Sequence, residues 1–331
     1  MAMKVHIFVT NDCNLSCDYC YVSGLREKLY FGSELVNSLI TFINNVLELN
    51  KSESVTLNFF GGEPLLNKRV IEDIIKASNK IKVKTYFMMT TNGTLLTKSN
   101  IDFLVKHNFI LSVSIDGTPE VHNRYRTYSN GEPSWEKIAP NLEYLLEKLP
   151  HVTARITYNT ESVSKLYPSV VFVSELGFQE IKPIPDFFDE KWDEEHFLIL
   201  REQFKYLESF SQNNKNIHLS VLDRTLKIQG DCSGGVSSFA VNANGDIYPC
   251  NYVVGEEEFC IGNIKDSEKY ELHTFPTDHS ERFECEGCSY FKSCTSSRCI
   301  FVNYKMTGEM CKPSGFFCAY ERLECSYAKT K

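Results

Sequence analysis

The 331-residue sequence lacks the features of membrane and exported proteins. It contains no run of about eighteen apolar residues that could span a bilayer. Its first residues also lack the apolar segment and the small-residue cleavage site of a secretory signal. These absences predict a cytoplasmic protein with no membrane partner. Hydrophobic residues make up 42% of the chain, which is enough for one large or two ordinary cores.

An excess of basic residues is also missing. The 35 Lys and Arg residues are outnumbered by 43 Asp and Glu residues, so the formal net charge is −8. Without a broad positive field, the chain is not expected to bind nucleic acid as its main partner. The same charge balance would instead attract a cationic peptide segment.

Cysteine, by contrast, is abundant. Disulfides explain the thirteen cysteines poorly, because the cytosol keeps thiols reduced and an odd number leaves at least one unpaired. Ten of them lie between Cys232 and Cys325, in spacings close to C-x2-C that suit a metal better than a packed interior. We therefore expect a metal-binding protein.

Apolar runs alternate with longer amphipathic stretches between residues 4 and 186. This alternation predicts parallel strands with right-handed crossovers, hence an α/β barrel or open sheet. In such folds the chemistry gathers at the C-terminal ends of the strands. The expected strands are 4–9, 54–60, 82–89, 109–115, 151–158 and 180–184, and the expected helices are 33–49, 67–80, 98–107, 135–148 and 162–176.

Three parts are expected along the chain. Residues 1–190 form the barrel or sheet, and residues 191–230 form a bridge that contains a helix over 194–212. Residues 231–331 contain most of the cysteines and show little periodicity. The order of this last part is expected to depend on metal.

The predicted strand ends carry the candidate site. The first strand runs into CNLSCDYCY, with Cys13, Cys17 and Cys20 on one loop. The second ends in GGEP, where glycines allow a close backbone approach and Glu63 offers a carboxylate. The third and fourth run into TTNGTLL and SIDGTPEVHNRYR. Taken singly, each could be ordinary turn chemistry, because Gly, Asn and Asp often end strands.

The C-x3-C-x2-C motif, with an aromatic residue on each side of its last cysteine, resembles the radical S-adenosylmethionine (radical SAM) superfamily when GGEP, TNGTLL and SIDG follow it. The resemblance covers about residues 4–190 and implies a partial (β/α)6 TIM-like barrel. It also implies that Cys13, Cys17 and Cys20 hold a 4Fe-4S cluster whose fourth iron binds S-adenosyl-L-methionine. One electron from that cluster would then yield a 5′-deoxyadenosyl radical.

The resemblance also assigns residues to S-adenosyl-L-methionine. Gly61, Gly62 and Glu63 would meet its ammonium, Ser114 and Asp116 its ribose, and Arg126 its carboxylate. Arg124 or Arg155 could take the last role instead. A surface salt bridge is the alternative interpretation of any one of these arginines.

The cysteines of the C-terminal part are similar to the SPASM extension of radical SAM enzymes that modify peptides and proteins. That extension implies two auxiliary 4Fe-4S clusters. One would be bound by Cys285, Cys288, Cys294 and Cys318, and the other would take three ligands from Cys232, Cys250 and Cys299. A zinc ribbon is the alternative, since C-x2-C pairs also fit tetrahedral zinc.

Some cysteines depart from the pattern. The segment CTSSRC has one residue more between its cysteines than the C-x3-C spacing common in the family, and it lacks the glycines often found there. Its loop must therefore take a different path to bring Cys299 to a cluster. Cys260, Cys311 and Cys325 are left over. Cys260 is the preferred fourth ligand of the auxiliary cluster that takes Cys232, Cys250 and Cys299, or else a catalytic hydrogen-atom donor. Without it, that cluster would have an open iron that could bind a substrate thiolate. A buried thiol that only packs is the plain alternative.

In its tail and around Cys250, the chain resembles maturases of ribosomally made peptides (RiPPs). These abstract a hydrogen from a peptide C–H and form a thioether, a carbon–carbon crosslink or an epimer. Anaerobic sulfatase-maturing enzymes, which generate formylglycine, are the alternative. They carry an Asp where this chain has Asn251, and a neutral amide cannot accept the proton.

A non-enzymatic iron–sulfur electron carrier or sensor is the rival from another class. It explains the cysteines but not Gly61–Glu63 or Ser114 at successive strand ends. The expected partners of the enzyme are a precursor peptide and an electron donor such as flavodoxin or ferredoxin. Because the first strand starts near residue 4, we expect the leader to be recognised by a separate leader-peptide-binding protein or by the two parts of this chain themselves.

Overall fold

The computed structural model describes residues 2–25, 27–275 and 285–328. One ten-stranded sheet runs through it, in the order β10-β9-β8-β1-β2-β3-β4-β5-β6-β7. The strands are β1 (Ala2–Thr10), β2 (Ser54–Gly61), β3 (Lys84–Thr91), β4 (Ile110–Ser114), β5 (Thr153–Tyr158), β6 (Glu180–Pro185), β7 (His218–Leu219), β8 (Ser238–Val241), β9 (Asp246–Tyr248) and β10 (Gly262–Asn263). Strands β1 to β7 pair in parallel, each with the next.

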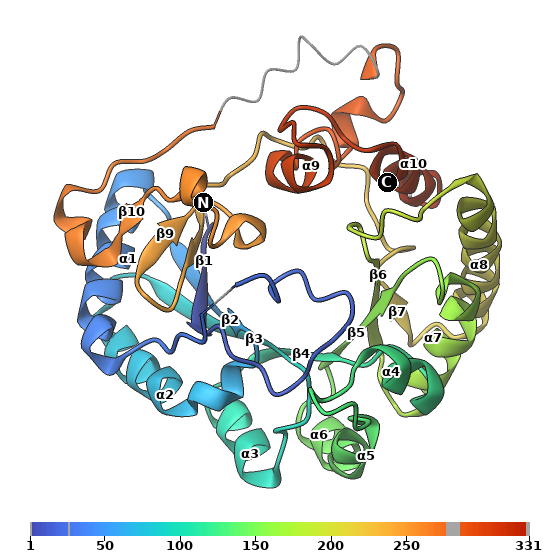
Figure 1. Cartoon of the computed structure of the whole chain (residues 1–331), viewed down its shortest axis with the longest axis horizontal. Helices are drawn as coiled ribbons and strands as arrows, with labels where there is room; N and C mark the ends of the chain where they lie inside the picture. The colour runs from blue at the N-terminus through green and yellow to red at the C-terminus, as the bar shows by residue number, and fades with distance from the viewer. Residues whose placement is uncertain (1, 26, 276–284, 329–331) are drawn as a thin grey trace.

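Helices α1 to α8 surround this sheet, and two more follow in the C-terminal part (Figure 1). They are α1 (Val36–Asn50), α2 (Lys68–Ala77), α3 (Lys98–Lys106), α4 (Pro119–Tyr125), α5 (Trp135–Ile138), α6 (Leu142–Lys148), α7 (Leu166–Glu175), α8 (Glu194–Asn213), α9 (Ile300–Thr307) and α10 (Gly315–Ser326). In Figure 1 the strands β1 to β6 follow one curve inside α1 to α8, and α9 and α10 lie across its open side. In the part of the chain that the structure describes, no helix is long and apolar enough to cross a membrane.

The predicted α/β fold, a partial (β/α)6 barrel with a cysteine-rich C-terminal part, is confirmed. The fold could be predicted because apolar residues recur at the helix and strand periods. On α1, Leu39, Ile43 and Val46 fall on one face and are fully buried. They pack with strand residues such as Ile7 and Phe59 in a core that lies between the sheet and its helices.

The helices between β4 and β5 differ from the predicted elements. The single helix expected over 135–148 is interrupted between α5 and α6 by a short 3-10 helix at Ala139–Asn141. Pro140 lies in this segment, and proline has no backbone N–H to continue the α-helical bonding. Helix α4, in the turn-rich segment after SIDG, was not expected.

The C-terminal part also joins the sheet. Strand β8 pairs in parallel with β1, and β9 and β10 follow as antiparallel strands. The expected units 1–190 and 231–331 therefore share one sheet. The second of these ranges includes residues 276–284 and 329–331, which lie outside the described residues.

Candidate active site

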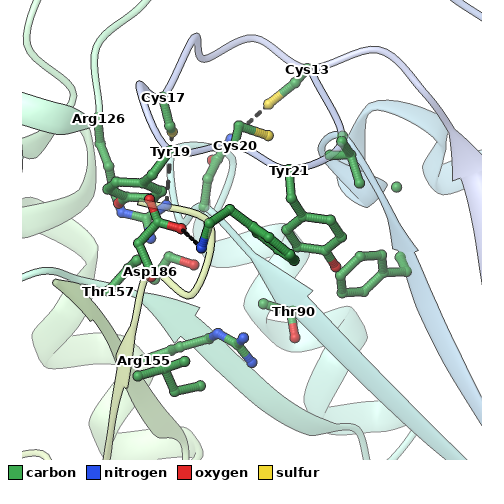
Figure 2. Close-up of a pocket in the computed structure, with 18 of the residues that line it drawn as sticks. Cys13, Cys17, Tyr19, Cys20, Tyr21, Thr90, Arg126, Arg155, Thr157 and Asp186 are labelled. Carbon is green, nitrogen blue, oxygen red and sulfur yellow. Dashed lines mark hydrogen bonds between the residues drawn. The ribbon is translucent and has the colours of Figure 1, made fainter. Parts of the chain in front are cut away.

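The cysteine loop follows β1 and is held across the end of the barrel by backbone bonds. Ser16 N donates to Thr127 O at 2.8 Å, and Asp18 N donates to Tyr125 O at 3.3 Å. Cys13, Cys17 and Cys20 all line one pocket (Figure 2), and the figure shows Thr90 and Arg155 on the side opposite this loop. The loop thus presents three thiols to the strand ends, as the sequence pattern predicts.

Burial shapes the chemistry of these thiols. It raises the pKa of Cys13 to about 12 and that of Cys17 to about 11. Both are therefore protonated thiols at neutral pH when no metal is bound. Since metals bind thiolates, formation of a cluster on this loop must release protons.

The pocket is a cavity of about 160 Å³ that opens to solvent. Its walls come from the C-terminal ends of β2 to β6 and from the cysteine loop. Of the residues predicted to bind S-adenosyl-L-methionine, the pocket is lined by Gly61, Gly62, Ser114 and Arg126, together with the alternative Arg155.

Gly61 and Gly62 bring the end of β2 directly against the cysteine loop. Gly61 has a φ of +134°, and a Cβ built on it would lie 2.0 Å from Thr10 O. A Cβ on Gly62 would lie 2.1 Å from Asp12 O. Gly62 N donates to Thr10 O at 3.0 Å. The close approach that these glycines predict is thus an approach to the loop that carries the thiols.

Glu63 was expected to meet the ammonium, but its carboxylate does not line the pocket. It is fully buried. Its Oε1 accepts bonds from Thr91 Oγ1 at 2.8 Å and Leu65 N at 3.1 Å, and its Oε2 accepts one from Asn92 N at 2.8 Å. Burial raises its pKa to about 7, although these bonds oppose the rise. Glu63 therefore ties the ends of β2 and β3 together, and places Asn92 on the pocket wall.

Asp116 was expected on the ribose, and it too is committed to protein groups. Its Oδ2 accepts bonds from Arg126 Nε at 2.8 Å and from the Tyr19 hydroxyl. Its Oδ1 accepts bonds from Arg126 Nη2 at 3.2 Å and Thr157 N at 2.9 Å. The carboxylate is buried and raises the pKa of the Arg126 guanidinium. Asp116 thus holds Arg126 in place.

The three candidate arginines differ in position. Arg126 lines the pocket, and its Nη1 lies 3.9 Å from Cys17 Sγ. Arg155 also lines the pocket, from β5. Arg124 is 58% exposed and pairs with Asp18 and Glu161, so it matches the surface salt bridge interpretation.

Sequence reasoning missed several pocket residues. Tyr19, Tyr21 and Tyr252 supply aromatic walls, and Asp186 supplies a carboxylate directly after β6. Asn251 Nδ2 donates to the Tyr21 hydroxyl at 2.9 Å, which joins the C-terminal part to the cysteine loop. The position of Asp186 at a strand end was the signal that could have found it.

The C-terminal cysteines form two groups. Cys285, Cys288, Cys294 and Cys318 line one pocket. In the other group, burial raises the pKa of Cys250 and of Cys299 to about 12, and the nearby Cys232 adds to both shifts. The donor sets are thiols alone, which is the chemistry of iron–sulfur ligation. Within the described ranges, no three His, Cys, Asp or Glu side chains are placed to hold a single metal ion.

Cys260 stands apart from both groups. It is exposed, and its Sγ lies 3.5 Å from Gly262 O. It does not line the pocket with Cys13, so its predicted role as hydrogen-atom donor gains no support. Its role as a fourth cluster ligand stays a prediction. Cys325 is buried and Cys311 is partly buried, and neither lines the pocket formed by Cys285 and its neighbours.

Comparison with known proteins matches both parts of the chain. The family model of the radical SAM superfamily matches residues 7–164, and the SPASM model, described as an iron–sulfur cluster-binding domain, matches residues 232–299. The chain is 25% identical over 324 residues to a cysteine-type anaerobic sulfatase-maturating enzyme of Clostridium novyi (strain NT). That alignment covers 87% of this chain and 85% of the relative.

Two solved structures share the fold. Native anSMEcpe with bound AdoMet and the Cp18Cys peptide has a TM-score of 0.79 at 20% identity, covering 99% of this chain and 96% of that one. Streptococcus suis SuiB bound to precursor peptide SuiA has a TM-score of 0.67 at 17% identity, covering 96% of this chain and 76% of that one.

Proposed function

Because the chain carries a radical SAM domain followed by a SPASM iron–sulfur domain, we propose that this enzyme oxidises a residue of a polypeptide substrate, in the manner of the anaerobic sulfatase-maturating enzymes that it resembles. The cofactors of these domains are a 4Fe-4S cluster, auxiliary clusters and S-adenosyl-L-methionine. Similarity to a sulfatase-maturating enzyme over 87% of the chain supports this function over peptide maturation, the first expectation from the sequence.

One observation carries the proposal: a single pocket joins three thiols of one loop to Gly62, Ser114 and Arg126. Cys13, Cys17 and Cys20 would hold the cluster. When bound there, the cluster and S-adenosyl-L-methionine supply a 5′-deoxyadenosyl radical.

This chain's own residues would hold the cosubstrate and shield it. Gly61 and Gly62 leave backbone groups accessible at the pocket wall, and Arg126 offers the guanidinium N–H that Asp116 leaves free. Tyr21, Phe188 and Tyr252 pack together, with ring centroids of Tyr21 and Tyr252 4.8 Å apart. These rings would exclude water and other hydrogen donors from the reaction.

Maturation of a ribosomally made peptide is the second candidate, and Asn251 favours it. Its amide nitrogen donates to Tyr21, and an amide cannot serve as the base that formylglycine formation needs. A thioether, crosslink or epimer would be the product in that case. A polypeptide substrate is common to both candidates, and both need an external electron donor such as flavodoxin or ferredoxin.

The test uses the anaerobic, reconstituted enzyme with S-adenosyl-L-methionine and dithionite. Two synthetic peptides are compared, one with a single central cysteine and one with alanine in its place. We expect 5′-deoxyadenosine together with an aldehyde on the cysteine peptide only, detected by hydrazine trapping and mass spectrometry. Formation of 5′-deoxyadenosine with a crosslinked or epimerised peptide and no aldehyde would reject the sulfatase-maturating type in favour of the second candidate.

A further inference from the structure

A buried histidine is linked to the backbone of both members of the Arg126–Asp116 ion pair. His122 belongs to α4, and both it and Ser134, which precedes α5, are 0% exposed. Neither residue lines the pocket. We propose that His122 is a positioning residue, which holds the backbone of the ion pair and so places Arg126 for the carboxylate of S-adenosyl-L-methionine. This inference rests on the proposed function.

Hydrogen bonds connect His122 to three backbone groups of the pair. Its Nδ1 accepts a bond from Asp116 N at 3.3 Å, and its backbone O accepts one from Arg126 N at 2.9 Å. Its Nε2 lies 3.0 Å from Ser134 Oγ, which donates to Arg126 O at 2.6 Å. Both backbone groups of Arg126 and the backbone N of Asp116 are therefore held by this one histidine, directly or through Ser134.

The partners decide which ring nitrogen of His122 carries the hydrogen. A backbone N–H can only donate, so Nδ1, which accepts from Asp116, carries none. The hydrogen of the neutral ring is then on Nε2, which donates to Ser134 Oγ, while the Ser134 hydroxyl donates to the Arg126 carbonyl. Burial lowers the pKa of His122 to about 4, so the ring is neutral near pH 7. Each donor in this relay meets an acceptor.

The neighbouring helix fixes the relay from the side. The Trp135 ring packs against the imidazole of His122 in an edge-on arrangement, with ring centroids 5.7 Å apart. Trp135 N donates to Asn123 Oδ1 at 3.0 Å, which ties the start of α5 to α4. Ser134 is therefore held at the distance that its bond to His122 needs.

The backbone of the pair has to be fixed because the contact between the side chains is forked. Arg126 Nε and Nη2 bind the two oxygens of Asp116, and this leaves Nη1 beside Cys17 on the pocket wall. Two parallel bonds form only in one relative placement of guanidinium and carboxylate. A shift between the backbones of residues 116 and 126 would break one of them and turn Nη1 away. His122 spans these two backbones.

The affinity for S-adenosyl-L-methionine tests the inference, by anaerobic isothermal titration of the reconstituted enzyme without reductant. In His122→Asn the amide oxygen can still accept the bond from Asp116 N, but the shorter side chain does not reach Ser134. Ser134→Ala breaks the relay at its next member. Each variant should weaken binding about fivefold, the value of one buried hydrogen bond. Wild-type affinity in either variant would overturn the inference.

Thr118→Ala is the matched control. The Thr118 hydroxyl accepts a bond from Val121 N and caps α4, so its loss loosens the helix that carries His122 without touching the relay. This variant should lower the midpoint of thermal unfolding and keep the wild-type affinity. An equal loss of affinity in Thr118→Ala would show that only the stability of α4 matters, and would overturn the inference.

Iron content is measured in every variant, because Thr127, next to Arg126, also holds the cysteine loop through its bond from Ser16 N. The iron content of His122→Asn should equal that of the wild type. A loss of iron in proportion to the loss of affinity would place the effect in the cysteine loop and overturn the inference.

A double-mutant cycle shows whether His122 acts through Arg126. Arg126→Gln removes the guanidinium that the relay positions. In that background His122→Asn should change the affinity by less than about twofold, because the two changes affect one interaction. The full fivefold loss in both backgrounds would mean that His122 acts elsewhere, and would overturn the inference.

The wild-type enzyme separates this inference from the proposed function. Its 5′-deoxyadenosine and its aldehyde product on the cysteine peptide test the proposed function alone. Their formation together with unchanged affinity in the variants overturns the role of His122 only. Weakened affinity in the variants, without 5′-deoxyadenosine from the wild type, overturns the proposed function only.

Discussion

The Arg126 guanidinium and the Asp116 carboxylate form a buried ion pair in the candidate active site, with Nε 2.8 Å from Oδ2 and side chains 8% and 0% exposed. Two of the three guanidinium nitrogens are committed to Asp116, and the third, Nη1, lies beside Cys17. A planar guanidinium held in this way is oriented before any ligand binds. The pair therefore fixes the third nitrogen of this guanidinium beside Cys17, on the wall of the pocket.

Arg126→Lys should weaken the binding of S-adenosyl-L-methionine about tenfold or more, because a lysine cannot make the forked contact with Asp116 and still reach the pocket. Isothermal titration of the reconstituted enzyme measures this. Arg124→Lys is the control, since Arg124 is exposed and does not line the pocket. Wild-type affinity in Arg126→Lys would show that Arg126 does not hold the cosubstrate.

Gly62→Ala should displace the cysteine loop, because the new Cβ would lie 2.1 Å from Asp12 O. We expect a loss of about 1–3 kcal/mol in the free energy of unfolding, typical of overpacking, together with a smaller iron content after reconstitution. Gly24→Ala lies on the same loop with open space around its Cβ and should match the wild type. Equal iron content in both variants would contradict the close approach.

Asn251→Asp separates the two candidate functions. A carboxylate at this position could accept the Tyr21 hydroxyl bond and then a substrate proton, as general bases do. If the lack of a carboxylate at position 251 limits cysteine oxidation, the aldehyde yield on the cysteine peptide should rise about tenfold or more in this variant. Asn251→Ala serves as the control for loss of the Tyr21 contact. If Asn251→Asp gave no more aldehyde than the wild type and Asn251→Ala, another group would have to take the proton.

Glu324 gives a pH dependence of stability. Burial raises its pKa from 4.5 to about 6, although Tyr320 and Arg224 oppose the rise. A raised carboxyl pKa means that the folded state binds the proton more tightly. The contribution of Glu324 to the free energy of unfolding should therefore fall by at most about 2 kcal/mol as the pH rises from 4.5 to about 6 and then level off.

The pH effect is measured by urea unfolding of the iron-free protein with a thiol reductant present. Glu324→Gln cannot titrate, so its unfolding free energy should change less across the same pH window. Glu208→Gln, an exposed acid on α8, should follow the wild type. A wild-type unfolding free energy that rises through this window relative to Glu324→Gln would contradict the direction of the shift.

Much of the fold could be predicted from the sequence, because long strands and helices repeat their buried positions. The short strands β8, β9 and β10 could not, since two to four residues are too few to show a period. Their place beside β1 is set by pairing, which is a contact between distant parts of the chain.

The candidate site was predictable where a motif and its contacts lie on one loop, as with Cys13, Cys17 and Cys20. Glu63 and Asp116 were assigned to the ligand by resemblance to the radical SAM superfamily, but in the structure their carboxylates accept bonds from groups at the ends of neighbouring strands. The hydrogen-bond partners of a buried carboxylate are set by the packed structure. They cannot be predicted from the sequence around that carboxylate. Asp186 was missed because a single acid after a strand carries no motif.

The most direct test of the central claim is the release of 5′-deoxyadenosine. The fully reconstituted enzyme is incubated anaerobically with S-adenosyl-L-methionine and dithionite, beside Cys17→Ala/Cys20→Ala. The account predicts 5′-deoxyadenosine from the wild type and none from the variant, which should still retain about eight of about twelve irons on its auxiliary cysteines. No 5′-deoxyadenosine from iron-replete wild type, or equal release by the variant, would contradict it.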